Sequence, residues 1–304
     1  MIHLIMIMAQ VDEVKVRLAQ AEDREAVLAF CQNTWENHSD YIHLVWDQWF
    51  AEPQGRIFVA VVNDVPVGIA RVVLMTDSEA WWEGLRVDPA YRGRGIASIL
   101  ESQREQFVLE ANLKVSRTCT ASDNTIRNEM MARRGRRKVG SYIYHKAISI
   151  DHGNGDKVTQ LVQLNSQDFN SIWELVNDFE FLSENPCLYV SRGAKWQELT
   201  PHLLKNCLEH GWVWGCQQND ELINLAIQSH SETSQKTFDL GHVNGKPETM
   251  GILLLELRQL AFEKGYSAVG GFFPVSDHLL KSLAKAGYQE GNLGEVWVYQ
   301  WQNY

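Results

Sequence analysis

The sequence is poor in features that mark several common classes of protein. It contains five cysteines, and none of them belongs to a Cys-x-x-Cys pair. A zinc site and a disulfide framework are therefore not expected, and reduced thiols in a cytoplasmic protein are the simplest interpretation. Positively charged residues are also the minority, because the chain has 28 Lys and Arg but 38 Asp and Glu. The formal net charge of -10 argues against nucleic acid as the main partner and suits a cationic or amine substrate.

Long apolar segments are missing as well. The opening stretch MIHLIMIMAQVDE holds an apolar run of about eight residues with no basic flank before it. This run is too short for a signal peptide or a bilayer span, so we expect no membrane partner. The chain also lacks the Rossmann pattern G-x-G-x-x-G and the P-loop pattern G-x-x-x-x-G-K-[ST], which excludes the commonest sequence signatures of nucleotide sites.

The 304 residues are enough for two ordinary domains, and periodicity indicates alternating strands and helices in the first half. Strands are expected at 14–19, 56–63, 67–76, 79–87, 114–121 and 138–148, and helices at 23–35, 41–51, 95–111 and 125–134. A turn at 64–66 is expected to join the second and third strands into a hairpin. The helix at 95–111 carries one apolar face: Ile96, Ile99, Leu100, Phe107 and Ala111.

The second half repeats this order of elements faintly. The stretch IDHGNGDK at 150–157 has the composition of a linker. After it, helices are expected at 165–179, 196–210 and 277–286, a hairpin at 212–230 about Asn219-Asp220, and strands at 266–273 and 295–301. One more helix presents Met250, Leu253, Leu254, Leu257 and Leu260 on one face. We therefore predict an α/β protein with mixed sheets, built as two tandem domains at 1–150 and 151–304.

The stretch LRVDPAYRGRGIA, residues 85–97, carries the clearest chemistry. A strand ends at Val87 and a helix begins near Gly95, so the first N–H groups of that helix lack intrahelical partners at the positive end of its dipole. Gly93 and Gly95 let a ligand approach the backbone, and Arg92 and Arg94 add charge. The arrangement predicts an anion site suited to a diphosphate. The alternative is a helix start whose glycines serve only a tight turn.

The run Arg92-Gly93-Arg94-Gly95-Ile96-Ala97 resembles the R/Q-x-x-G-x-G/A motif of the GCN5-related N-acetyltransferase (GNAT) superfamily, and it stands after the fourth strand, as in that family. The resemblance implies an acetyl-CoA-dependent N-acetyltransferase in the first half. It implies that backbone amides from Gly93 to Ser98 hold the pyrophosphate and that the strand edge Leu85-Arg86-Val87 pairs with the pantetheine arm. The Val87 N–H then points at the thioester carbonyl, whose oxygen gains charge during attack.

Glu83, in WWEGLRV, is the candidate general base that removes a proton from the attacking amine. Its neighbours Trp81 and Trp82 favour desolvation, which raises the pKa of a carboxyl group. The alternative is an ion-paired glutamate with Arg86 or Arg71 as its partner. Simple alternation places Glu83 on the side of Leu85 and Val87, but a bulge of the kind found in related folds reverses this facing.

The GNAT resemblance is incomplete after the fifth strand. Asn124 and Gly135 stand where the family pattern has an asparagine and a glycine, but Met131 occupies the position of the usual tyrosine and Arg136 that of a phenylalanine. The family's general acid toward the thiolate is thus missing, and Tyr142, Tyr144 or water are the candidate substitutes. Asn124 either contacts the cofactor or acts only as a helix cap.

The second half resembles the same fold without its cofactor motif. Aligning the helices places Lys246 to Gly251 on the motif, with Pro247 lacking an N–H, Glu248 replacing Arg94 and Thr249 replacing a glycine. The sequence Ala286-Gly287-Tyr288 keeps the family's closing signature. We predict that acetyl-CoA binds the first domain alone and that the second domain is degenerate. The basic run 133–138 is interpreted as a solvated face or as an attraction for the CoA 3′-phosphate.

The acceptor is expected to be a small-molecule amine. The run Glu83-Gly84-Leu85-Arg86-Val87, followed by a degenerate second half, resembles the histidine N-acetyltransferase-like group, which implies acetylation of the α-amine of a free amino acid. A second hypothesis is a catalytically silent protein that binds acyl-CoA or serves as a scaffold, which the methionine at position 131 favours. No metal is expected in either case.

Overall fold

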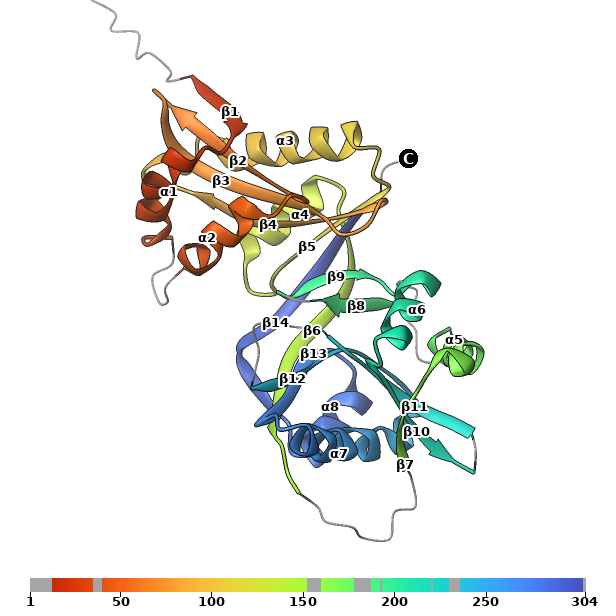
Figure 1. Ribbon diagram of the computed structural model, residues 1–304. Helices are drawn as coiled ribbons and strands as arrows, with labels where there is room; N and C mark the ends of the chain where they lie inside the picture. Colours follow the sequence, from red (N-terminus) through yellow and green to blue (C-terminus); the bar gives the residue numbers. More distant parts are fainter. Residues whose placement is uncertain are drawn as a thin grey trace, which may run out of the picture. The chain divides into compact units, whose positions relative to one another are not determined.

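The computed structural model describes residues 13–34, 40–151, 160–177, 187–191, 193–219, 221–229 and 236–302. The chain divides into two compact units, Met1–Ser116 with Gln302–Tyr304, and Arg117–Trp301 (Figure 1). The opening apolar segment, most of the stretch at 150–157 and Asp220 lie outside the described residues. The predicted fold class, an α/β protein with mixed sheets, is confirmed.

The first unit is built on four antiparallel strands in the order β1-β2-β3-β4. Their bounds are β1 (Val14–Leu18), β2 (Gly55–Val62), β3 (Val65–Leu74) and β4 (Glu79–Val87). The hairpin between β2 and β3 turns at Asn63 and Asp64, whose φ angles are 49° and 65°. The expected turn at 64–66 is therefore shifted, because Val62 and Val65 already pair and leave a two-residue loop of the kind that needs positive φ.

Helices cover both faces of this sheet (Figure 1). One face carries α1 (Arg24–Cys31), which follows a short 3-10 turn η1 (Ala21–Asp23), and α2 (Ile42–Ala51). Ile57 and Val59 of β2 pack with these two helices in one buried cluster. The other face carries α3 (Ile96–Glu110), whose Phe107 lies 6.1 Å from Phe58 in an edge contact. The alternation of β2 thus separates two apolar layers.

The inner face of α3 differs from the expected one. Ile99 is 40% exposed, whereas Glu101 and Arg104 are fully buried together with Ile96 and Leu100. Helical spacing assigned apolar residues to the core and left charged ones outside, so it missed this pair.

Most of the chain's strands belong to the second unit. Its elements are β5 (Val115–Ala121, which starts at the boundary), α4 (Thr125–Arg133), β6 (Arg137–Ile148), β7 (Gln160–Gln163), η3 (Ser166–Asp168), α5 (Phe169–Val176), β8 (Leu188–Ser191), β9 (Lys195–Glu198), α6 (Pro201–Glu209), β10 (Val213–Gln218), β11 (Glu221–Gln228), β12 (Thr237–Gly245), α7 (Pro247–Glu263), β13 (Ala268–Pro274), α8 (Asp277–Lys285) and β14 (Gln289–Gln302). The sheet order is β5-β14-β6-β13-β12-β11-β10-β7.

The C-terminal strand β14 lies between β5 and β6, two strands that precede residue 150. It pairs with β6 from Gln289↔Lys146 to Gln300↔Arg137, while the other edge of β6 pairs with β13. The strand β6, which precedes residue 150, is thus hydrogen-bonded on both edges to strands that follow it, β14 and β13. This pairing explains why the compact unit begins at Arg117 rather than after residue 150. The division into an active domain at 1–150 and a degenerate one at 151–304 concerns the role of each half and stays a prediction.

The expected helix at 196–210 is wrong in its first third. Residues Lys195–Glu198 form β9, which pairs with β8 in a separate two-stranded sheet, and α6 begins only at Pro201 behind the N-cap Thr200. The expected apolar face of α7 is confirmed, because Met250, Leu253, Leu254, Leu257 and Leu260 are all buried. Within the described residues, no helix combines the length and the apolar character that crossing a membrane requires.

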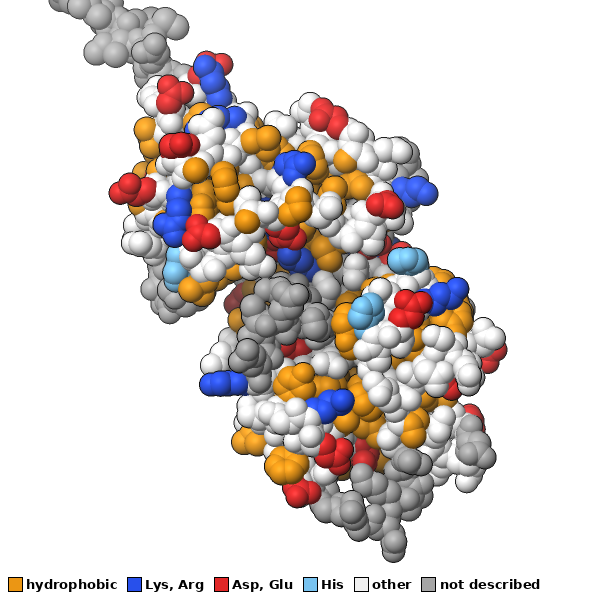
Figure 2. All heavy atoms as spheres, in the orientation of Figure 1, with side chains coloured by type: hydrophobic (Ala, Val, Ile, Leu, Met, Phe, Trp, Pro, Cys, Tyr) orange, Lys and Arg blue, Asp and Glu red, His pale blue; other side chains and the backbone are white. Residues whose placement is uncertain are grey.

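Acidic and basic side chains are interspersed over the described surface in the view of Figure 2. This distribution accords with the modest excess of negative charge in the sequence.

Candidate functional site

The end of β4 contains a β-bulge at Gly84. Ile69 pairs with Arg86 and Arg71 pairs with Glu83, so β4 has one residue more than β3 across this interval. Gly84 has a φ of 68°, and a side chain there would come within 2.7 Å of the Trp49 ring. Only glycine suits a position with this φ and this close neighbour. The bulge expected from the family resemblance is therefore present.

Glu83 forms an ion pair with Arg71 of β3, directly across the bulge. The guanidinium of Arg71 is fully buried, lies 4.9 Å from the Trp49 ring and also binds Glu52 at the end of α2. The side chain of Glu83 is 12% exposed, and that of Glu52 is 32% exposed. Of the two partners expected for an ion-paired Glu83, the structure thus shows Arg71. Two carboxylates on one arginine leave this corner with a net negative charge.

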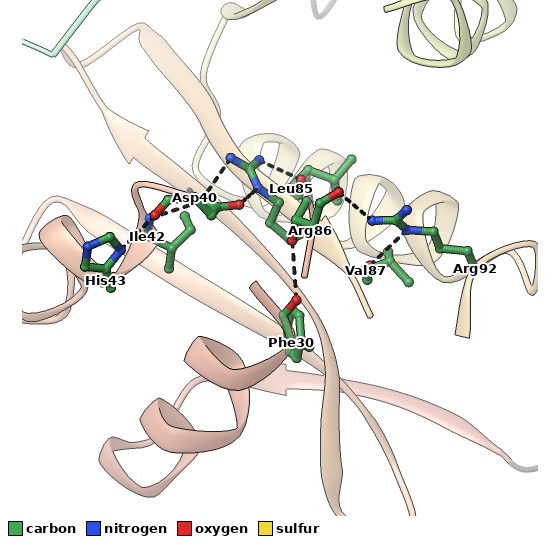
Figure 3. A network of polar contacts seen from close by, with 9 residues as sticks. Phe30, Asp40, Ile42, His43, Leu85, Arg86, Val87 and Arg92 are labelled. Carbon is green, nitrogen blue, oxygen red and sulfur yellow. Dashed lines mark hydrogen bonds and ion pairs between the residues drawn. The ribbon is translucent and has the colours of Figure 1, made fainter. Parts of the chain in front are cut away.

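Arg86 has a different partner, Asp40, next to the start of α2 (Figure 3). Its Nε donates to Asp40 Oδ2 at 2.5 Å, and its Nη1 donates to the carbonyl of Leu85 at 2.9 Å. Burial lowers the pKa of Arg86, but the hydrogen bond to Asp40 and the charges of Asp40, Tyr41 and Cys31 together raise it above its ordinary value. Asp40 also accepts the Ile42 N–H at 3.0 Å, so this pair fastens α2 to the end of β4. The side chain of Arg86 therefore serves the fold, and only its backbone is left for a ligand.

The backbone of Val87 points toward the edge of β4 opposite β3. The next residue, Asp88, donates its N–H to Val67 of β3 at 2.9 Å. Because successive N–H groups along a strand alternate in direction, the Val87 N–H is directed away from β3. The Val87 carbonyl is likewise directed outward, since it accepts from Arg92 Nε at 3.4 Å (Figure 3). This is the orientation that the resemblance requires of the thioester contact.

A loop of eight residues, Asp88 to Gly95, joins β4 to α3 and contains the short turn η2 (Pro89–Tyr91). Gly93 and Gly95 have φ angles of 78° and 79°, and no atom lies within 4 Å of the position of a Cβ at either. The space above both glycines is open to a ligand, as expected. The positive φ values also show that the turn itself requires glycine, so the two alternatives of the sequence are compatible.

The N-terminus of α3 is exposed and has no capping side chain. Gly95 is its N-cap, and its first turn contains no acidic residue. Ile96 is buried, Ala97 is half-buried and Ser98 is exposed. The helix is 15 residues long, so the positive end of its dipole lies at these amides. Its start therefore has the properties of an anion-binding helix terminus.

The arginines of the loop are held differently. Arg92 donates through Nη2 to the carbonyl of Thr34 at 3.1 Å, and the Arg94 guanidinium lies 4.8 Å from the Tyr91 ring. Both side chains are exposed. They add positive charge beside the glycines without occupying the helix start.

Asn124 is the N-cap of α4 in the second unit, and its side chain accepts the Arg127 N–H at 3.1 Å. The capping role that the sequence left open is thus present, and contact with a cofactor stays a prediction. Met131 is fully buried. Burial also raises the pKa of Tyr142 and Tyr144. These two tyrosines are therefore protonated at neutral pH, which a general acid requires, although their pKa values disfavour repeated ionisation.

Between β12 and α7, where every residue is described, the second unit has no counterpart of the Asp88–Gly95 loop. Lys246 alone separates β12 from α7, where it is the N-cap, and Pro247 and Glu248 stand in the first turn of the helix. The residues aligned with the phosphate motif, Lys246 to Gly251, are therefore the N-cap and the first residues of α7. The loop that carries the motif in the first unit is missing at this position.

One buried pair behind the bulge was not predicted. Arg104 of α3 donates through Nη1 to the carbonyls of Arg71 and Glu83, both at 3.3 Å, and Nη2 binds Glu101. Its guanidinium also lies 4.8 Å from the Trp82 ring. The pair thus supports the two strands where the bulge interrupts their regular pairing. The spacing of Glu101 and Arg104, three residues apart on an otherwise amphipathic helix, is the one signal in the sequence.

Residues 20–135 match the model of the acetyltransferase (GNAT) family. This region is a GNAT acetyltransferase domain. No curated protein matches the chain. Among solved structures, a GCN5-related N-acetyltransferase from Sphaerobacter thermophilus has a TM-score of 0.62 at 14% identity, with 95% of each chain covered. A tandem GNAT protein from the clavulanic acid biosynthesis pathway has a TM-score of 0.54 at 14% identity, with 95% of this chain and 98% of that chain covered.

A fungal multi-domain GH3 β-N-acetylglucosaminidase with a glucosamine N-acetyltransferase region has a TM-score of 0.62 at 14% identity, with 96% of this chain and 38% of that chain covered. At such identities these likenesses concern the fold alone. They cover nearly the whole chain, and the similarity to the tandem GNAT protein supports a fold made of two GNAT-like halves.

Proposed function

We propose that this protein transfers the acetyl group of acetyl-CoA to the amine of a small molecule, by direct attack of the amine within a ternary complex. The proposal depends on one observation above all, the uncapped start of α3 behind two glycines of positive φ and open surroundings. Several N–H groups converge there, and hydrogen bonds to charged oxygens contribute about 1.5–3 kcal/mol each. GNAT family membership of residues 20–135 supports the same cosubstrate.

Different residues of the first unit bind different parts of acetyl-CoA in this proposal. The amides from Gly93 to Ser98 bind the pyrophosphate, and Arg92 and Arg94 attract its charge. The edge Leu85-Arg86-Val87 hydrogen-bonds the pantetheine arm through its backbone. When bound, acetyl-CoA supplies an activated acyl group as a thioester. The Val87 N–H donates to the carbonyl oxygen of that thioester, where negative charge develops during attack.

Glu83 acts as the general base in this proposal. An amine is mostly protonated at neutral pH, and its attack requires the loss of a proton to a carboxylate, directly or through water. Glu83 is partly accessible and stands at the bulge next to the strand edge that binds the thioester. Arg71 orients its carboxylate, and the nearby Glu52 adds negative charge that favours an approaching ammonium group. The bond from the amine to the acetyl carbon forms as the carbon–sulfur bond breaks, and the thiolate takes up a proton from water.

The acceptor that we favour is the α-amine of a free amino acid, in line with the resemblance of Glu83–Val87 to the histidine N-acetyltransferase-like group. One structurally similar protein carries a glucosamine N-acetyltransferase region, which makes amino sugars the comparison class. Release of CoA thiol from acetyl-CoA with the twenty amino acids, glucosamine and simple alkylamines tests the choice. Turnover with amino sugars alone would contradict it.

The burial of Met131 at the usual tyrosine position favours a second candidate, a catalytically silent protein that binds acyl-CoA. Titration with acetyl-CoA separates the hypotheses when combined with the thiol assay. Active enzyme predicts one binding site per chain and thiol release. One site without release by any amine supports the silent protein, and two equivalent sites contradict the predicted loss of the site in the second half.

A further inference from the structure

A cavity of about 450 Å³ lies within the second unit, where β12 and β13 part. The parallel pairing of these strands runs from Thr237↔Ala268 to Leu240↔Gly271. Beyond this point β12 continues to Gly245 and β13 to Pro274. The residues that line the opening between them include Leu240, His242, Phe272, Ser276 and Leu279. The volume is within the range of pockets that hold small molecules.

The cavity is unsuited to coenzyme A because its phosphate-binding parts are missing. Lys246 is the only residue between β12 and α7, so there is no glycine loop beside the cavity. Pro247 has no N–H to offer, and Glu248 brings negative charge to the first turn of α7. Lys246 itself binds Glu221 at 2.9 Å. The features that are proposed to hold the diphosphate of coenzyme A in the first unit are therefore missing at the start of α7.

The lining also disfavours a cation. None of the lining residues that the structure describes is Asp or Glu, so an ammonium group finds no counter-charge among them. Lys138, the lysine among the described lining residues, is exposed and has its Nζ 3.9 Å from the Trp297 ring. The walls are mostly apolar, and Tyr142 and Phe272 present aromatic rings that both pack against Trp196.

His242 supplies a polar group next to the aromatic wall of the cavity. Its Nδ1 lies 3.1 Å from the carbonyl oxygen of Leu188, which only accepts hydrogen bonds, so Nδ1 carries the proton. Nε2 is therefore an acceptor, and it lies 3.6 Å from Cys187 Sγ. Burial lowers the pKa of His242 to about 4 and raises that of Cys187 to about 12, which keeps both groups neutral. Among the described lining residues, the cavity thus presents this uncharged acceptor together with the polar side chains of Ser141, Asn244, Ser276 and His278.

We propose that this cavity is a second binding site, which takes a small, flat, uncharged molecule whose single N–H or O–H group donates to Nε2 of His242. The site occupies the position in the degenerate half that corresponds to the acetyl-CoA site of the first half. It is independent of acetyl transfer and does not require acetyl-CoA to be bound.

Three related probes test the class of ligand: indole, the anion indole-3-acetate and the cation tryptamine. Calorimetric titration of the full-length chain is expected to show saturable binding of indole, with affinity at least fivefold higher than for either charged relative. Saturating acetyl-CoA should leave the affinity for indole unchanged. No saturable binding of indole, equal affinity for all three probes, or competition by acetyl-CoA each overturns the proposal.

The variant His242→Phe removes the acceptor and keeps an aromatic ring, and it should weaken indole binding at least fivefold. His202→Phe, at an exposed histidine of the same unit, is the matched control and should bind like the wild type. A second measurement needs no variant: indole should slow alkylation of Cys187 by N-ethylmaleimide and leave that of Cys119 unchanged. Equal rates at Cys187 with and without saturating indole would place the ligand elsewhere. Loss of acetyl-CoA binding, by contrast, would affect the proposed function alone.

Discussion

Arg71 and Glu83 stand opposite each other on β3 and β4 and form an ion pair across the bulge at Gly84. The same guanidinium binds Glu52, so a single buried cation orients two partly accessible carboxylates. Breaking a buried pair is costly, because the remaining charge loses its compensation. The position of Glu83 is therefore fixed by β3 and α2 rather than by its own strand alone, which suits a group that must meet a substrate at a defined distance.

Glu83→Gln is expected to reduce kcat by about 10²–10⁴-fold, because the amide does not accept the amine proton. The affinity for acetyl-CoA should stay within twofold, since the pyrophosphate contacts are elsewhere. Thiol release and calorimetry give the two quantities. Glu52→Gln is the matched control, as it removes the other carboxylate of Arg71 and should reduce kcat by less than tenfold. A rate unchanged in Glu83→Gln would remove this residue from the mechanism.

Gly95→Ala is expected to weaken acetyl-CoA binding at least tenfold, because a methyl group intrudes where the ligand approaches the start of α3. It should also lower the free energy of unfolding by about 1–2 kcal/mol, the cost of a left-handed alanine. The two effects are separated by Gly265→Ala in the second unit. Gly265 has a φ of 80° against 79° for Gly95, and no atom lies within 4 Å of either Cβ position.

Denaturant unfolding and acetyl-CoA titration of both glycine variants complete this test. Similar losses of stability are expected, with loss of affinity in Gly95→Ala alone. If the two variants lose affinity equally, the start of α3 is not the pyrophosphate site.

Arg104→Met is expected to destabilise the protein by about 3–5 kcal/mol, because it leaves Glu101 charged and buried without its partner. The double variant Glu101→Leu/Arg104→Met should recover most of this loss, since the unpaired charge is gone. It should still show a lower kcat than the wild type, because the carbonyls of Arg71 and Glu83 lose their donor at the bulge. Denaturant unfolding measures the first effect and thiol release the second. Full activity of the double variant would show that this pair serves stability alone.

The candidate site was predictable where its signals are local. The strand at 79–87 has the expected bounds, and the helix after Gly95 begins within one residue of the expected position. Both depend on short-range patterns: alternation, a Pro turn and glycines before a helix. For an ion-paired Glu83, the sequence offered two partners, Arg71 and Arg86. The choice between them depends on which residues lie opposite each other on β3 and β4, and the bulge shifts that register.

The features that escaped prediction depend on contacts distant in sequence. The insertion of β14 between β5 and β6 joins residues near 290–302 to residues near 137–146, and no local pattern encodes it. Glu101 and Arg104 look like solvent-exposed residues of a helix until α3 is packed on the bulge. The helix expected at 196–210 includes β9 because Trp196 and Leu199 are three residues apart, which fits helical spacing, and the pairing of β9 with β8 is not visible in that local pattern.

Asn124→Ala is expected to lower the free energy of unfolding by about 1 kcal/mol, since the cap of α4 loses its acceptor for the Arg127 N–H. Asn124→Asp should restore this stability, because a carboxylate caps equally well, but it does not restore the amide donor. If the amide of Asn124 also donates to the cosubstrate, both variants bind acetyl-CoA several-fold more weakly, and this is the result that we expect. Wild-type affinity in Asn124→Asp would leave the residue with its capping role only, and the binding of acetyl-CoA to the loop at Gly93–Ser98 and the strand edge Leu85–Val87.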